Sequence, residues 1–166
     1  KFGMWWKSSL YEDSARVPLI ASGPDFEAGQ RVQTPVSLMD VQATFFDLTQ
    51  TECPSDWVGE SLNQVGKNDP ERVAFSEYHG HGTRASAYMI RKGNWKYIHY
   101  IDAPHQLFNL ADDPDELQNL YHNNLEIATE FEAELRSICS PELEQDRAEA
   151  YIQRQIELVE EHTKNS

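Results

Sequence analysis

The sequence predicts an α+β fold: a small antiparallel sheet of about four strands, with helices packed on one face. Short apolar stretches follow one another between residues 72 and 110, with no helical segment between them. Strands in immediate succession form an antiparallel meander, because a parallel crossover needs about a dozen or more residues. Two apolar stripes at helical spacing follow between residues 125 and 159. These helices supply the layer that buries the apolar face of the sheet.

The first fifty residues predict one strand and one helix. Residues 17–22 (VPLIAS) read as a buried strand that ends at the turn signal GPD of residues 23–25. A helix opens at residues 34–36, with Ser37 or Thr34 as its N-cap. Its predicted core-facing positions are Val36, Met39, Ala43, Phe45, Phe46 and Leu48. The chain from 49 to 70 reads as a loop.

The sheet and the C-terminal helices come next. The predicted strands cover residues 72–78, 85–92, 95–101 and 107–110, and the second and third form a hairpin around Gly93-Asn94. Residues 112–117 (DDPDEL) predict the start of a short helix, with proline near its first position. The stripes at 125–138 and 148–159 predict two longer helices that cover one face of the sheet.

Charge and composition narrow the classes of partner. A net charge of −14 disfavours nucleic acid and anionic membranes, since both require a basic surface. It leaves an anionic small substrate open, because one focused pocket can be positive on an acidic protein. No apolar run approaches the roughly 18 residues of a membrane span. Cys53 and Cys139 lack metal-type spacing; two free thiols are the preferred interpretation, with a disulfide left open.

Lys7 is the sharpest candidate for binding an anion. It follows the aromatic pair Trp5 and Trp6 and precedes two serines. Its ammonium is a compact charge with three donors, which suits a tetrahedral oxyanion. From spacing alone, however, a surface lysine near a chain end is the better interpretation.

The second candidate is the segment from His79 to Arg84. Two imidazoles, His79 and His81, flank one glycine at the end of a predicted strand, where loops often carry function. Two ligands are too few for a closed metal site, but they could hydrogen-bond a substrate, with Arg84 adding positive charge. A flexible glycine-rich tip is the competing interpretation. Glu12 is expected to pair with Arg16 rather than to act as a general acid or base.

Three stretches together resemble the type I sulfatases of the alkaline-phosphatase-like superfamily. Residues 3–20 (GMWWKSSLYEDSARVPLI) resemble that family's G-x-W-x-K-x-x-x-Y-E-x-S-x-R-V-P-L-I segment. Residues 89–98 (MIRKGNWKYI) and 106–120 (QLFNLADDPDELQNL) are similar to its R-x-G-x-W-K-Y and L-F-D-L-x-x-D-P-x-E-x-x-N-L signatures. Residues 34–40 (TPVSLMD) resemble the start of a family helix. The nearest branch resembles the bacterial choline-sulfatases and arylsulfatases.

This resemblance implies a sulfuric ester hydrolase. In the family, a formylglycine made from Cys or Ser attacks sulfur, and calcium polarises the sulfate. Lys7 matches the lysine that contacts sulfate, which reverses the interpretation from spacing alone. The loop from His79 to Arg84 matches a variable substrate-side loop, so His79, His81 and Arg84 are predicted to bind substrate, and Trp6 to form part of the site wall.

The resemblance also sets expectations about what this chain lacks. No C/S-x-P-x-R formylglycine motif occurs, and Cys53-Pro54 lacks the arginine. The family's calcium ligands lie in a large N-terminal α/β domain. We therefore expect no cofactor site in this chain, which would be inactive alone. Residues 1–50 would be the trailing piece of the α/β catalytic domain, 51–70 a connection, and 71–166 a C-terminal subdomain; the N-terminal strand and helix would belong to the α/β core.

Two other functions remain open from the sequence. One is a phosphonate or phosphate monoester hydrolase of the same superfamily. The other is a stand-alone, non-catalytic binding or assembly module. The expected partner of the enzyme is a small sulfate ester. The exposed strand at 17–22 or the C-terminal helices would support a homo-oligomer, because an unpaired apolar strand promotes association.

Overall fold

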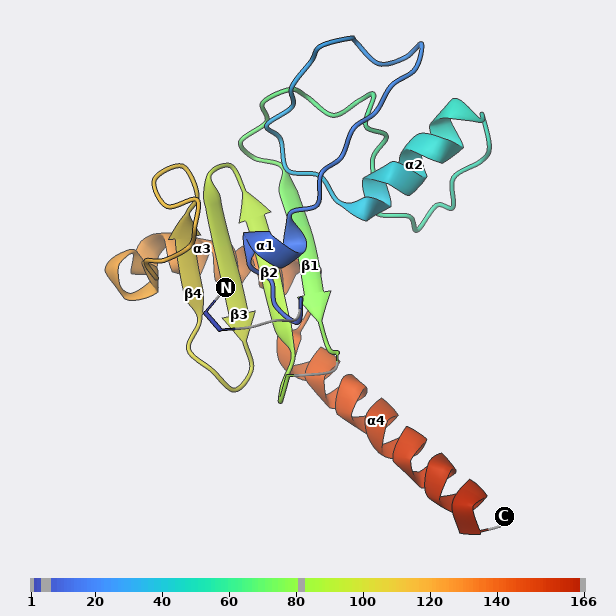
Figure 1. Cartoon of the computed structure of the whole chain (residues 1–166), viewed down its shortest axis with the longest axis vertical. Coiled ribbons are helices and arrows are strands. Elements are labelled where there is room, and N and C mark those ends of the chain that lie inside the picture. The colour runs from blue at the N-terminus through green and yellow to red at the C-terminus, as the bar shows by residue number, and fades with distance from the viewer. Residues whose placement is uncertain (1, 4–6, 81–82, 165–166) are drawn as a thin grey trace.

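The computed structural model describes residues 2–3, 7–80 and 83–164, and a four-stranded antiparallel sheet forms its centre (Figure 1). The strands are β1 (Val73–Tyr78), β2 (Ala87–Lys92), β3 (Trp95–Tyr100) and β4 (Gln106–Asn109), side by side in chain order. Lys92 lies opposite Trp95, so Gly93 and Asn94 form the two-residue turn of the β2–β3 hairpin. Gly93 has a φ of 52°, a left-handed conformation that glycine adopts without strain. The predicted meander is confirmed.

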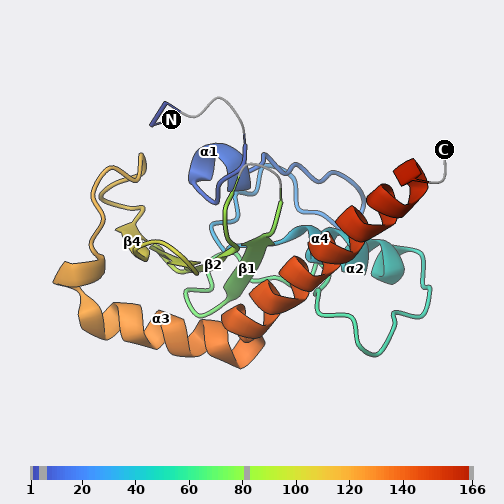
Figure 2. The same cartoon turned by 90° about the horizontal axis from the view of Figure 1, so that it is seen from below.

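Helix α3 (Leu125–Ile138) packs on one face of the sheet (Figure 2). Its apolar positions repeat every three or four residues, so they form one stripe. The core on this face consists of Tyr88, Ile90, Tyr97 and Leu107 from the strands and Ala128, Phe131 and Leu135 from α3. This packing confirms the predicted helical cover of the sheet.

The other face of the sheet is also covered. Leu10, Tyr11 and the short helix α1 (Glu12–Ala15) lie across it, on the side opposite α3 (Figure 2). Leu10 and Tyr11 pack with Ala87, Met89, Ile98 and Phe108, the strand residues that alternate with the α3-facing set. Burial on both faces explains the continuous apolar run of β2. The sequence had predicted cover on one face only.

Helix α2 (Leu38–Leu48) begins two residues after the predicted opening at residues 34–36, and Ser37 is the correct one of the two predicted N-caps. Ser37 is its N-cap: the Ser37 hydroxyl accepts the amide of Met39, and the Asp40 carboxylate accepts the amide of Ser37 at 2.7 Å. The predicted core-facing side is largely open, however. Met39, Phe45 and Leu48 are exposed, whereas the buried members of the helix are Asp40, Ala43 and Thr44.

Residues 17–22 do not form the predicted strand. Val17, Leu19 and Ile20 are exposed, with Ile20 at 92%. A strand is defined by ladder hydrogen bonds to a neighbour, and no described strand pairs with this segment. The apolar pattern was real, but the pairing partner that it requires is not found among the described residues.

Residues 112–117 form turns rather than the predicted helix. The Asp113 carboxylate accepts the amides of Leu117 and Gln118. In a helix, backbone amides donate to backbone carbonyl groups instead. Glu116 has a φ of 51°, a left-handed backbone conformation that does not occur within a right-handed helix. A 3₁₀ turn, η1 (Tyr121–Asn123), precedes α3.

Helix α4 (Pro141–Lys164) leaves the sheet and projects from the molecule (Figure 1). Pro141 and Gln145 are its buried residues, whereas Ile152, Ile156 and Val159 are exposed. The prediction that this helix covers the sheet is therefore wrong beyond its first turns. Periodicity shows which face of a helix is apolar but not what covers that face.

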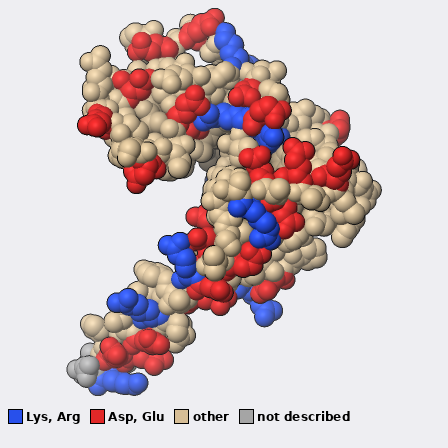
Figure 3. Space-filling model, turned by 180° about the vertical axis from the view of Figure 1, so that it is seen from behind, with Lys and Arg blue, Asp and Glu red and all other residues tan. Residues whose placement is uncertain are grey.

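The surface carries charges of both signs, and the two cysteines are free. On the face in Figure 3, acidic and basic side chains are interspersed and the basic ones do not gather into one patch. No helix in the described part of the chain is long and apolar enough to cross a membrane. Cys53 is exposed, Cys139 is partly buried, and both are free thiols.

Candidate functional site

A buried ion cluster of Glu12, Lys96 and Glu116 lies between α1 and the sheet. Lys96 is fully buried in β3, and its Nζ lies 2.8 Å from Glu116 Oε1 and 3.0 Å from Glu12 Oε1. The second oxygen of Glu116, Oε2, accepts the backbone N–H of Glu12 at 2.7 Å. Glu116 therefore binds both the lysine and the main chain at the start of α1.

Lys96 needs an acidic partner at this position, because burying an unpaired charge costs several kcal/mol. Arg91 adds a further cation on the same side of the sheet. Burial lowers the pKa of Arg91, and the charges of Glu12 and Glu116 act against that shift. The expected Glu12–Arg16 pair is also present, at 3.9 Å between Arg16 Nε and Glu12 Oε2.

The segment that carries Lys7 lies between the end of β1 and α1. Lys7 is exposed, and the neighbouring Ser8 lies against the end of β1, where the Tyr78 hydroxyl donates to Ser8 Oγ at 3.2 Å. The hydroxyls of Ser9 and Ser14 are 3.0 Å apart, which links this segment to α1. The structure thus brings the segment of Lys7 to the strand end that precedes His79.

The side chains of His79 and Tyr78 contact opposite faces of the sheet, since Tyr78 packs with the core on the α1 side. The ring of His79 packs edge-on against Tyr88, a member of the α3-side core, at 5.4 Å between ring centroids. Its Nδ1 lies 2.6 Å from Ser86 Oγ and its Nε2 lies 3.2 Å from Glu77 Oε2. Both ring nitrogens are therefore engaged by protein groups.

The row of Glu77, His79 and Ser86 has the order of a hydrolytic triad, but it lacks an accessible nucleophile. Ser86 is buried, and its amide donates to Gln145 Oε1 at 2.7 Å. A serine nucleophile must reach its substrate. This row therefore fixes the imidazole and ties the start of β2 to α4.

Arg84 is exposed on the loop before β2. The other predicted site residues, Trp6 and His81, lie outside the described residues. Within the described ranges, no group of three or more His, Cys, Asp or Glu side chains could hold a metal ion. Calcium and formylglycine stay predictions from the resemblance.

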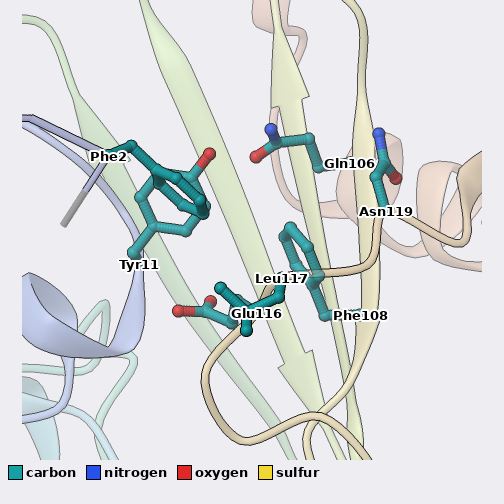
Figure 4. A pocket seen from close by; sticks show the side chains of 7 residues that line it. All are labelled: Phe2, Tyr11, Gln106, Phe108, Glu116, Leu117 and Asn119. Atoms are coloured by element: carbon teal, nitrogen blue, oxygen red, sulfur yellow. The ribbon is translucent and has the colours of Figure 1, made fainter.

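A hollow of about 270 Å³ opens beside the ion cluster (Figure 4). It is lined by Phe2, Tyr11, Gln106, Phe108, Glu116, Leu117 and Asn119. The rings of Phe2 and Tyr11 lie 5.3 Å apart, and those of Tyr11 and Phe108 6.1 Å apart. Aromatic walls with amide groups suit an uncharged flat ligand. None of these described lining residues carries a positive charge, which makes the hollow a poor site for a sulfate group.

A second group of titratable side chains lies on the α3 side of the sheet. The rings of His99 and His105 stack at 4.1 Å, and the hydroxyl of Tyr97 lies 3.1 Å from Nδ1 of His99. Burial, with a smaller effect of His105, lowers the pKa of His99 to about 4. Burial lowers the pKa of His105 as well, so burial disfavours the charged form of both stacked rings.

The sequence had not singled out Lys96 and Glu116. Both lie in signatures that the sequence does contain: Lys96 is the lysine of WKY at residues 95–97, and Glu116 is the glutamate of DPDE at residues 113–116. Glu12 is the acidic position of the first signature. The available signal was a lysine between two aromatic residues of a predicted strand, a position where a charge must find a buried partner.

Residues 1–140 match the family described as "N-sulphoglucosamine sulphohydrolase, C-terminal". This match covers most of the chain, and the chain belongs to that family. It is the C-terminal region of a sulfatase, as the resemblance implied.

The chain is similar to arylsulfatase K of Homo sapiens, at 38% identity over 148 residues. That alignment covers 81% of this chain and 27% of the relative. Arylsulfatase K of Mus musculus is 39% identical over 147 residues, with the same two shares. The chain thus spans about a quarter of the length of these relatives.

Among solved structures, the fold is similar to that of a 2-O GAG sulfatase, with 25% identity and a TM-score of 0.52. This likeness covers 60% of the present chain and 23% of the other. Helix α4 lies beyond the residues that the family match includes.

Proposed function

We propose that this chain works within an enzyme that hydrolyses sulfate esters, and that Lys7 donates to the sulfate oxygens. The observation that carries the proposal is the buried ion cluster, which joins the charged positions of three family signatures and anchors the Lys7 segment. A lysine on an anchored segment loses less freedom on binding an anion than one on a free end. Its three donors suit the oxygens of a tetrahedral sulfate.

The proposed substrate is a small sulfated sugar. Supporting this class, one similar structure is named a 2-O GAG sulfatase. The relatives are named arylsulfatases, which supports sulfate-ester hydrolysis without indicating a sugar. Arg84 is exposed and carries a fork of donors that matches sulfate geometry. We assign the loop that contains His81 and Arg84 to the substrate side, and Trp6 to the wall of the site. His79, whose ring is held by Ser86 and Glu77, would fix the base of this loop.

The remaining chemistry is proposed to come from outside residues 1–166. The expected calcium ion would polarise the sulfate and the expected formylglycine would supply the nucleophile. Within this chain, Lys7 would bind and orient the sulfate. We therefore propose that the 166-residue chain alone is inactive, and that the division at residues 50 and 70 separates its catalytic-domain part from its C-terminal part.

Self-association is proposed through the exposed apolar residues of α4, with the segment 17–22 as the other surface. Tyr151 and Val159 on α4 are each 65% exposed, which is unusual for a helix that has an apolar face. Light scattering of the whole protein tests this proposal. A dimer that Ile156→Asp converts to a monomer supports α4, whereas a monomer at all concentrations rejects self-association.

The test of the main function uses the whole gene product with an aryl sulfate and the matched aryl phosphate. Lys7→Met is expected to lower kcat/KM for the sulfate by about 100-fold or more, as losing one oxyanion donor does. Lys67→Met is the matched control, since Lys67 is an exposed lysine that pairs with Glu27. Faster turnover of the phosphate, or no effect of Lys7→Met, would reject the proposal. Intact mass would also reveal a formylglycine in the whole protein.

A further inference from the structure

We propose that Lys96 and Glu116 are positioning residues for the sulfate site, because they fix the register of the segment that carries Lys7. This inference rests on the proposed function of Lys7. Neither residue is proposed to touch the substrate, because Glu116 is 1% exposed and Lys96 is fully buried. Their effect would pass through Glu12 to the main chain five residues after Lys7.

The contacts fix this segment at two points. At one end, Glu12 binds Lys96 through its carboxylate and Glu116 through its backbone N–H. At the other end, Ser8 accepts the hydroxyl of Tyr78. Between these points, Leu10 and Tyr11 pack into the sheet. A segment held at both ends, with apolar residues between, has one favoured position on the sheet.

The ionic part of this anchor gives the specificity that apolar packing lacks. Hydrophobic contact is non-directional, so Leu10 and Tyr11 alone would tolerate sliding. Glu12 must present both its carboxylate and its N–H to one Lys96–Glu116 pair, and any slip breaks both contacts. A one-residue slip of an extended segment moves a side chain by about 3.4 Å. Misplacements of about 1 Å are enough to cost about 100-fold in rate.

The conformation of Glu116 is consistent with a positioning role. Its φ of 51° is rare for a residue with a side chain, and such conformations persist where the surroundings impose them. Here the turn of residues 113–116 brings both carboxylate oxygens of Glu116 into contact, one with Lys96 and one with Glu12. The turn thus presents a carboxylate to the sheet face on which α1 lies.

A double-mutant cycle on the whole enzyme separates positioning from simple stability. The variants are Glu116→Gln, Lys7→Met and the double substitution, with kcat/KM measured on an aryl sulfate. Glu116→Gln is expected to lower kcat/KM by about 100-fold, and to have little further effect when Lys7 is already Met. Hydrogen exchange of residues 7–16 should rise while that of β2 and β3 is unchanged.

Arg72→Met is the matched control, because it breaks a partly buried ion pair with Asp40 that holds α2 instead. It should leave kcat/KM for the sulfate within about twofold. If Glu116→Gln fails to fold, Glu12→Gln removes one carboxylate of the cluster at a less buried position and takes its place in the cycle.

The two proposals fail in different ways. If Lys7→Met alone has no effect, the proposed function is wrong. If Lys7→Met is impaired but Glu116→Gln is fully active, or if the two losses multiply in full, the positioning role is wrong and the function of Lys7 stands.

Discussion

The sheet region and the α2 region are stabilised in different ways. Around β1–β4, α1 and α3, the buried side chains are mostly apolar and fill two cores, one on each face. Between residues 17 and 70, the buried side chains are Thr34, Asp40, Ala43, Thr44 and Ser61, and apart from Ala43 all are polar. The sheet region is thus held by the hydrophobic effect, and the α2 region by hydrogen bonds.

Asp40 shows how the α2 region is held. Its carboxylate accepts the backbone amides of Ser37 and Glu60 and an Nη of Arg72, at 2.7 to 2.9 Å. These bonds join α2, the loop after it and the chain that enters β1. A polar network of this kind fixes a conformation while leaving apolar side chains such as Phe45 exposed. Exposed apolar side chains in one region are typical of a surface that packs against further protein.

The largest expected difference concerns two phenylalanines on helices. Phe131 of α3 is 4% exposed and Phe45 of α2 is 58% exposed. Phe131→Ala should lower the free energy of unfolding by about 3–5 kcal/mol, because it opens a cavity in the core. Phe45→Ala should change it by no more than about 0.5 kcal/mol. Urea unfolding of the 166-residue chain measures both, and equal losses would show that the two regions do not differ.

The next effect concerns two threonines of the α2 region. The Thr44 hydroxyl is buried, donates to Asp40 O and accepts the amide of Leu62 at 2.9 Å. Thr44→Val should therefore cost about 1–3 kcal/mol and speed hydrogen exchange at residues 60–62. Thr49→Val is the matched control, since its hydroxyl is exposed and donates to Phe45 O. If both variants exchange alike, hydrogen bonds do not hold this region.

The sequence predicts the elements whose packing partners lie nearby in the chain. Alternation and helical spacing predict β1–β4 and α3 because their partners lie nearby in the chain, and Ser37 was identifiable from local capping chemistry. The extended segment 17–22 depends on a distant partner. The ion cluster likewise joins residues as far as 104 positions apart. Lys96 and Glu12 are 84 positions apart, so no local pattern places one against the other.

The candidate site was predictable to a different degree. Lys7 and the loop from His79 to Arg84 were predicted from motifs. The structure adds the contacts that hold them, at Ser8 and at the His79 ring. The orientation of the His79 ring depends on packing against Tyr88 and on a bond to Ser86, which motif spacing does not contain. Signatures locate functional segments, whereas side-chain direction is set by the tertiary fold.

An effect of pH on stability is expected in the sheet region. The pKa of His99 is about 4 in the folded chain, against an ordinary 6.5, because the ring is buried beside His105. The unfolded chain therefore binds more protons between these values, and the free energy of unfolding should fall as pH drops from about 6.5 toward 4. Urea midpoints at pH 7.5 and 5.0 measure this fall.

His99→Gln should flatten that pH dependence, whereas His122→Gln, at an exposed ring outside the stacked pair, should leave it in place. Glu142 affects stability in a lower pH range than His99. The Arg136 guanidinium lowers the pKa of Glu142 to about 2, so the stability that this ion pair contributes is lost only below about pH 4.5. A fall that persists in His99→Gln would assign it to other groups.

The most direct test of the central claim is hydrogen exchange of the chain around α1. The segment with Lys7 is proposed to belong to the sheet region, through Glu12, Lys96 and Glu116, whereas residues 17–22 do not. Amides of residues 10–16 should exchange slowly, close to those of β3, and amides of residues 17–22 should exchange near the unprotected rate. Equal, rapid exchange in both segments would contradict the claim that the ion cluster holds the proposed sulfate-binding segment in place.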